Sequence, residues 1–145
     1  MNNKLRVSMV EMVSDADPNV RWQSNWIEVT GPGEVAQVPG GRKCVPRFQM
    51  MCEEIRSDIQ TVEGSGASTL KALHLVESGL SAAEKLGGNA WYTFISLDEV
   101  RFEGLYDQGD GGEVTFSQYK LAVETYIRFL TDPDRNPVEV VFLDL

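Results

Sequence analysis

The chain is poor in the side chains that most nucleophilic enzymes and metal sites need, because it has one histidine, His74, and two cysteines among 145 residues. A Ser-His-Asp or Cys-His mechanism, or a histidine metal site, would have to use His74. This residue lies in an apolar stretch, with Ser78 and no second ligand type four positions later. We therefore expect His74 on a helix surface, and we predict a protein that is not an enzyme and uses no cofactor or metal.

The two cysteines, Cys44 and Cys52, are eight positions apart. This spacing matches neither a redox Cys-x-x-Cys motif nor a zinc-ligand pair, and two cysteines are too few for a disulfide scaffold. We predict that both are free thiols.

Positive charge is also scarce, with 13 Lys and Arg against 22 Asp and Glu, a net charge of −9 and a pI near 4.5. Proteins that bind nucleic acids draw much of their affinity from Lys and Arg that neutralise phosphates. The composition therefore disfavours a DNA or RNA partner and favours a basic protein partner.

Long apolar runs are missing as well. The first dozen residues contain no unbroken apolar stretch of the length that a secretory signal needs, and no later run approaches a membrane span. We expect a cytoplasmic protein with no membrane partner. A length of 145 residues with 42% hydrophobic side chains is typical of one globular domain, 1–145.

Short apolar segments alternate with polar residues as expected for β-strands. Residues 4–13 predict a first strand, and residues 26–29 predict a short second strand that ends at Gly31-Pro-Gly33. The segment that follows, through Gly40-Gly41, is a loop or a weak hairpin. Further strands are predicted at these ranges: 90–97, which is aromatic and β-branched; 100–106; and 138–143.

Three segments have helical periodicity. The first begins at Pro46 and repeats apolar residues to Val62. The second is expected after a break at Gly64-Ser-Gly66, with Ser68 or Thr69 as its cap and Leu70, Leu73, Val76 and Leu80 facing inward, before Gly87-Gly88 ends it. The third follows a capping box, Thr115 to Gln118, and stops at Asp132-Pro133. These elements predict an α+β fold: a mixed, mainly antiparallel sheet of about four to six strands, with two or three helices mostly on one face.

Two glycine-rich segments partly match known binding loops. Residues 107–118 have the Asp, Gly and apolar residue of an EF-hand at positions one, six and eight, but lack three side-chain ligands, including the final Glu, which is Gln118 here. Residues 64–69 could present backbone N–H groups to an anion, but they lack the Gly-Lys-Ser/Thr of a P-loop. We interpret both segments as turns that precede capped helices.

The acidic residues are concentrated in the C-terminal part of the chain. Up to Val62 there are seven basic and eight acidic residues, net −1, whereas the rest has six basic and fourteen acidic residues, net −8. Within Asp98 to Glu113, Arg101 is the one basic residue among six carboxylates, which we predict to lie along one strand and its following turn: Asp98, Glu99, Glu103, Asp107, Asp110 and Glu113. Such a field steers a cationic partner. Trp22, between Arg21 and Gln23, is a candidate exposed anchor for the same partner.

An acidic strand, a glycine turn and a late aromatic helix occur together at Val100-Arg-Phe-Glu-Gly104, Phe116-Ser-Gln-Tyr119 and Tyr126-Ile-Arg-Phe-Leu130. In this combination the chain resembles the bacterial immunity proteins of polymorphic-toxin and contact-dependent growth inhibition systems. The resemblance covers the C-terminal third. It implies a stoichiometric inhibitor, monomeric or weakly dimeric, that binds a cognate toxin, often a basic nuclease. The carboxylates of 98–113 would then contact Lys and Arg of the toxin.

Two other classes fit the same composition. A secretion chaperone or adaptor shares the size and the acidity, and would form a stable homodimer around an extended effector segment. A small-ligand-binding domain would use Trp22, Trp26, Trp91 and the Met50-Met51 pair around an apolar pocket.

Overall fold

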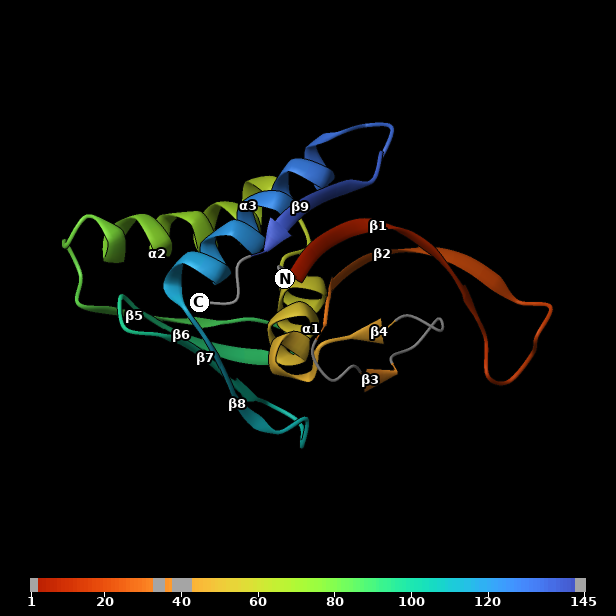
Figure 1. Cartoon of the computed structure of the whole chain (residues 1–145), viewed down its shortest axis with the longest axis horizontal. Helices are drawn as coiled ribbons and strands as arrows, with labels where there is room; N and C mark the ends of the chain where they lie inside the picture. The colour runs from red at the N-terminus through yellow and green to blue at the C-terminus, as the bar shows by residue number, and fades with distance from the viewer. Residues whose placement is uncertain (1–2, 33–35, 38–42, 143–145) are drawn as a thin grey trace.

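The computed structural model describes residues 3–32, 36–37 and 43–142, and these form two antiparallel sheets around three α-helices (Figure 1). The first sheet has the order β2-β1-β9, with β1 at Asn3–Val13, β2 at Arg21–Thr30 and β9 at Val138–Phe142. The second sheet follows chain order: β5 (Ala83–Gly87), β6 (Trp91–Ser96), β7 (Val100–Gly104) and β8 (Asp110–Val114). Two short antiparallel strands of two residues each, β3 (Ala36–Gln37) and β4 (Lys43–Cys44), form a third small sheet, and β4 lies beside β2.

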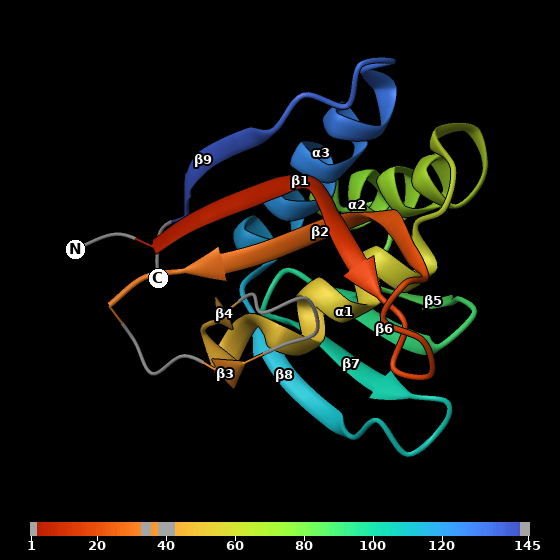
Figure 2. The same cartoon turned by 90° about the vertical axis from the view of Figure 1, so that its right-hand side faces the viewer.

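The helices pack on the two larger sheets, and α1 lies between them. A 3-10 turn, Pro46–Phe48, leads into α1 (Gln49–Asp58), which contacts β2 of the first sheet and β6, β7 and β8 of the second. The helix α3 (Phe116–Thr131) packs on β1 and β9, and its Tyr119 ring lies 5.7 Å from the Phe102 ring of β7. The helix α2 (Ala67–Glu77) covers β5 and β6. Figures 1 and 2 show α1 between the β1–β2 ribbon and the β5–β8 sheet.

The α+β class predicted from the sequence is confirmed, with the strands divided over two larger sheets. Strands occur where alternation predicted them at 4–13, 90–97, 100–106 and 138–143, of which Leu143 lies outside the described residues. The loop or weak hairpin predicted through Gly40-Gly41 is represented by β3 and β4, and residues 33–35 and 38–42 also lie outside the described part. The capping box at Thr115 and Gln118 is present, and α3 ends at Thr131 as predicted.

The second predicted helix is wrong at both ends. Residues 62–66 form a π-helical turn that continues directly into α2, so Gly64-Ser-Gly66 is helical and does not interrupt the helix. The N-terminal cap is therefore Thr61, not Ser68 or Thr69 as predicted. The helix ends at Glu77, because Gly79 adopts a left-handed φ of 79° that helical geometry cannot continue. Residues 83–87 are therefore a strand. Leu73 and Val76 are buried as predicted, but Leu70 and Leu80 are exposed.

Cys44 and Cys52 are buried free thiols, as predicted. The fold brings them together, because both line the same small pocket beside Trp26, and each thiol shifts the pKa of the other through a side-chain hydrogen bond. This hydrogen bond lowers the pKa of Cys44 and, together with burial, raises the pKa of Cys52. Eight residues of sequence separation gave no sign of this contact.

No helix in the described ranges combines the length and the apolar character that a membrane crossing requires.

The position of the α2 cap can be tested by comparing two alanine substitutions. The Gly64 N–H donates to Thr61 Oγ1 over 2.9 Å, so Thr61→Ala removes a cap and should lower the free energy of unfolding by about 1 kcal/mol. Ser68→Ala, at the residue that the sequence favoured, should change it by less than about 0.5 kcal/mol. Urea unfolding of both variants measures these values, and a larger loss for Ser68→Ala would contradict the assignment.

Candidate functional site

The β5–β8 sheet has one face against the helices and one face that no described helix covers, visible below the sheet in Figure 1. Along β6, Trp91, Thr93 and Ile95 are buried, whereas Tyr92 and Phe94 point to the opposite face and are half-buried. Period-two alternation therefore places two aromatic rings on an open sheet surface. We call this surface the outer face. It carries Lys85, Tyr92, Phe94, Arg101, Glu103 and Asp110.

Two cationic side chains contact the aromatic rings of the outer face. Lys85 of β5 and Arg101 of β7 both pair directly with Phe94, one from each side. The Arg101 guanidinium lies 4.0 Å from the Phe94 ring centroid, and Lys85 Nζ lies 4.1 Å from that of Tyr92 and 5.4 Å from that of Phe94. These cation–π contacts stabilise the positions of the rings. Phe94, Lys85 and Arg101 also line a shallow groove of about 320 Å³ together with Glu99.

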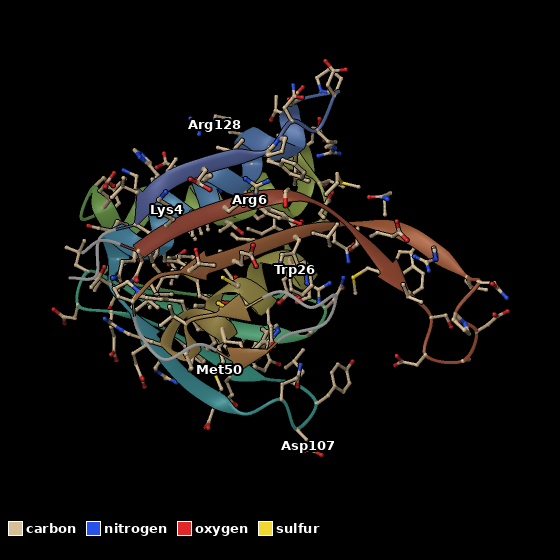
Figure 3. The ribbon with its side chains drawn as sticks, turned by 45° about the vertical axis from the view of Figure 1, so that its right-hand side comes forward. Lys4, Arg6, Trp26, Met50, Asp107 and Arg128 are labelled. Atoms are coloured by element: carbon tan, nitrogen blue, oxygen red, sulfur yellow. The ribbon has the colours of Figure 1, made fainter. Side chains whose placement is uncertain are left out.

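All six predicted carboxylates are exposed, and they lie on one hairpin and the turn before it. Asp98 and Glu99 form the β6–β7 turn, and Asp107 projects from the β7–β8 turn, away from the body of the protein (Figure 3). Glu103 on β7 stands directly opposite Asp110 on β8. Glu113 is the remaining carboxylate and belongs to β8. None of the ion pairs found among the described residues includes any of the six.

The sequence placed these carboxylates on one strand and a turn, but Asp110 and Glu113 belong to a second strand, β8. Glycine makes this strand possible. Gly109, Gly111 and Gly112 all have positive φ, between 59° and 104°, which side chains other than glycine rarely adopt. A Cβ atom on Gly112 would also lie 2.8 Å from Met50 Cβ on α1, so the strand can approach α1 only where side chains are absent.

The EF-hand-like segment 107–118 is thus a turn, the strand β8 and the start of α3. Its last residue, Gln118, completes the capping box by accepting the Thr115 N–H over 2.9 Å. Within the ranges that the structure describes, no group of three or more His, Cys, Asp or Glu side chains is placed to hold a metal ion.

Trp22 is 48% exposed, whereas Trp26 and Trp91 are buried. It lies opposite Met12 in the distal part of the β1–β2 ribbon, which extends away from the β5–β8 sheet in Figure 1. The first sheet is three strands wide only where β9 pairs with residues 3–7 of β1. At the far end of the ribbon, Val13, Val20 and Trp22 are exposed, and no described element covers them. Trp22 and the six carboxylates are therefore two separate surfaces.

Two acidic residues of α1 that the sequence did not single out define an interior site. Glu54 is 2% exposed and accepts a hydrogen bond from the Tyr119 hydroxyl over 2.5 Å. Burial raises the pKa of Glu54 to about 8. Asp58, one turn later, accepts the N–H groups of Ala90 and Trp91. The signal for Glu54 was its position among Met51, Cys52 and Ile55, on the apolar face of the predicted helix.

Comparison of the chain with protein-family models, with curated proteins and with solved structures gave no match.

The Glu103–Asp110 pair should lower the stability of the sheet, because like charges directly opposite each other on one face repel. We expect Asp110→Asn to raise the free energy of unfolding by about 0.5 kcal/mol at low salt, and by less at high salt. Urea unfolding at two salt concentrations measures the effect, with Asp15→Asn in the β1–β2 turn as a control. A loss of stability in Asp110→Asn would contradict the repulsion.

The raised pKa of Glu54 predicts a pH dependence of stability. The folded chain keeps this proton up to about pH 8, whereas the unfolded chain releases it near its ordinary value of 4.5. The folded state therefore binds more protons between these values, and the free energy of unfolding should fall as pH rises from 5 to 8, by on the order of 4 kcal/mol in total.

Glu54→Gln removes the titrating group, so this contribution should disappear from its profile of unfolding free energy against pH. Glu53→Gln, at the adjacent half-buried residue, is the matched control and should keep the wild-type slope. Parallel profiles for wild type and Glu54→Gln would refute the assignment.

Proposed function

We propose that this protein binds a basic protein partner through the outer face and the adjoining carboxylates of 98–113, and that it is an immunity protein for a cognate toxin. The observation that carries the proposal is the exposed Glu103–Asp110 pair at the edge of an uncovered aromatic surface. Two like charges held opposite each other cost stability, and a cationic partner would offset that cost. Selection for stability alone gives no reason for this arrangement.

The two parts of the surface suit two stages of binding. The carboxylates would attract Lys and Arg of the partner from a distance and raise the association rate. Tyr92 and Phe94, already held by Lys85 and Arg101, would lose little conformational freedom on contact and could act as anchors that slow dissociation.

The toxin as partner rests on the resemblance of residues 100–130 to immunity proteins. In that role the protein would act stoichiometrically in the cytoplasm, as a monomer or weak homodimer, by covering an active site or an adjacent surface of a basic toxin domain. It would need no catalytic residue of its own.

The partner can be identified by affinity capture of the tagged chain from its native cytoplasm, with mass spectrometry at low and high salt. We expect one basic protein in a one-to-one complex that weakens with salt, and reduced toxicity of that protein when bound. An effector held by a stable dimer of this chain would instead identify a secretion chaperone. Capture of no protein would favour a ligand-binding domain.

With the partner in hand, charge reversal tests the surface. Asp107→Lys, Asp110→Lys and Glu113→Lys combined should slow association about tenfold or more at low salt and flatten its salt dependence, as measured by stopped-flow fluorescence. The control variant reverses Asp15, Glu63 and Asp134, three exposed carboxylates outside residues 98–113, and so changes net charge equally. Equal association rates for the two variants would refute the proposed surface.

A further inference from the structure

A polar cavity of about 220 Å³ lies between α1, the start of α2 and the β5–β6 strands. It is on the covered side of the sheet, because Thr93, which lines it, points opposite to Phe94 of the outer face. Its polar lining consists of two carboxyl groups and four hydroxyls, those of Glu54, Asp58, Ser65, Ser68, Thr69 and Thr93. The site is therefore separate from the surface proposed above.

The cavity has a buried floor and an open mouth. Glu54, Thr69 and Thr93 are 2%, 5% and 2% exposed, whereas Ser68 and Gly88 are exposed. A ligand that entered past Ser68 would meet Asp58 half-way and Glu54 at the bottom. The cavity volume corresponds to roughly seven water molecules at about 30 Å³ each, so it suits a small molecule.

Asp58 is held rigidly at the cavity wall. Its Oδ1 accepts the Ala90 N–H over 3.0 Å, and its Oδ2 accepts the Trp91 N–H over 3.1 Å. The chain can pass this close because residue 88 is glycine, where a Cβ would lie 2.2 Å from Asp58 Oδ2. Oδ1 also lies 3.1 Å from the Ser57 hydroxyl, whereas Oδ2 accepts the Trp91 N–H alone among the described donors and so keeps a lone pair for a ligand.

The lining contains no Lys, Arg or His. The titratable groups that face Glu54 are Asp58, on its own helix, and Tyr119, on α3, while β6 contributes the Thr93 hydroxyl. Burial is the main reason that the pKa of Glu54 is raised, and the charge of Asp58 raises it further. The cavity thus presents an excess of acceptors together with the negative charge of Asp58, and none of the described residues that line it is a cation.

We propose that this cavity binds a small primary ammonium compound, whose charged nitrogen donates to the carboxyl groups of Asp58 and Glu54. An ammonium group has three donors and no acceptor, which complements this lining. The remainder of the ligand would lie toward the mouth, with hydroxyls near Ser65 and Ser68 and carbon atoms against Leu86.

Calorimetric titration of the intact chain with matched pairs of compounds tests this proposal. The amines are 2-aminoethanol, 1,4-diaminobutane and glucosamine. In their counterparts each amino group is replaced by a hydroxyl group, which gives, in the same order, ethylene glycol, 1,4-butanediol and glucose. At least one amine should bind at millimolar or lower concentration, about tenfold or more tightly than its counterpart, as expected for charge-assisted hydrogen bonds. Binding of none of the amines, or equal binding of amine and counterpart, would overturn the proposal.

Proton release gives a second readout. A bound cation favours ionised Glu54, so amine binding at pH 7 should release up to one proton, seen as a dependence of the binding heat on the ionisation enthalpy of the buffer. Glu54→Gln should abolish the release and weaken binding, and Asp58→Asn should weaken binding about tenfold or more. Glu53→Gln is the control. If Asp58→Asn does not fold, the Glu54→Gln variant and the comparison of amines with their hydroxyl counterparts on the wild-type chain still test the proposal. Proton release that persists in Glu54→Gln would contradict the assigned site.

This test fails or succeeds independently of the proposed function. Amine binding does not require the partner, and charge reversal at residues 107–113 leaves the cavity lining unchanged.

Discussion

The helix α1 contacts both larger sheets, and α3, which packs on the first sheet, reaches the second through one aromatic ring; the rest of the architecture depends on this junction. At its centre, Tyr119 of α3 lies against Phe102 of β7 and donates its hydroxyl proton to Glu54 of α1. A buried carboxyl group is costly unless it is hydrogen-bonded, so this bond fixes α1 relative to α3, and the Tyr119 ring connects the pair to the second sheet. Any shift of α1 would disturb both sheets at once.

Both proposed sites follow from the two-residue period of a single strand. Thr93 of β6 points into the layer of helices and lines the polar cavity, whereas its neighbour Phe94 points to the outer face between Lys85 and Arg101. The covered side therefore offers a small, acceptor-rich cavity, and the open side offers a broad surface with aromatic rings and charges. These two environments differ in the ligands they can select, which is why the proposals can be tested separately.

Local sequence signals predicted the elements whose formation depends on local chemistry. The alternation in residues 4–13, the aromatic run from Ala90 and the Thr115–Gln118 capping box each specified an element that is present. The errors occur where tertiary contacts or the backbone conformation of glycine determine the structure. Gly79 ended α2 earlier than the apolar pattern suggested, and the glycines of 109–112 formed a strand where a turn was expected.

The candidate sites were predictable to a similar extent. The exposed carboxylates were visible from composition, but the opposition of Glu103 and Asp110 depends on the register of β7 and β8. The pairing of Glu54 with Tyr119 joins residues 65 positions apart, so no local pattern could indicate it. The separation of Trp22 from the carboxylates is likewise a result of tertiary arrangement.

The first strand, β1, belongs to two different environments along its length. From Asn3 to Val7 it is the central strand of the first sheet, paired on both sides with β2 and β9. From Ser8 to Val13 the described structure pairs it only with β2; Ser8 and Val10 are still buried in the core, whereas Glu11 and Val13 are exposed at the end of a two-stranded ribbon that the Glu11–Arg21 ion pair braces. An isolated two-stranded ribbon is only marginally stable in water. The exposed end of the ribbon, from Glu11 to Val13 and from Arg21 to Gln23, should therefore open and close many times while the core stays folded, and Trp22 would sample orientations over that cycle that the rigid sheets do not allow.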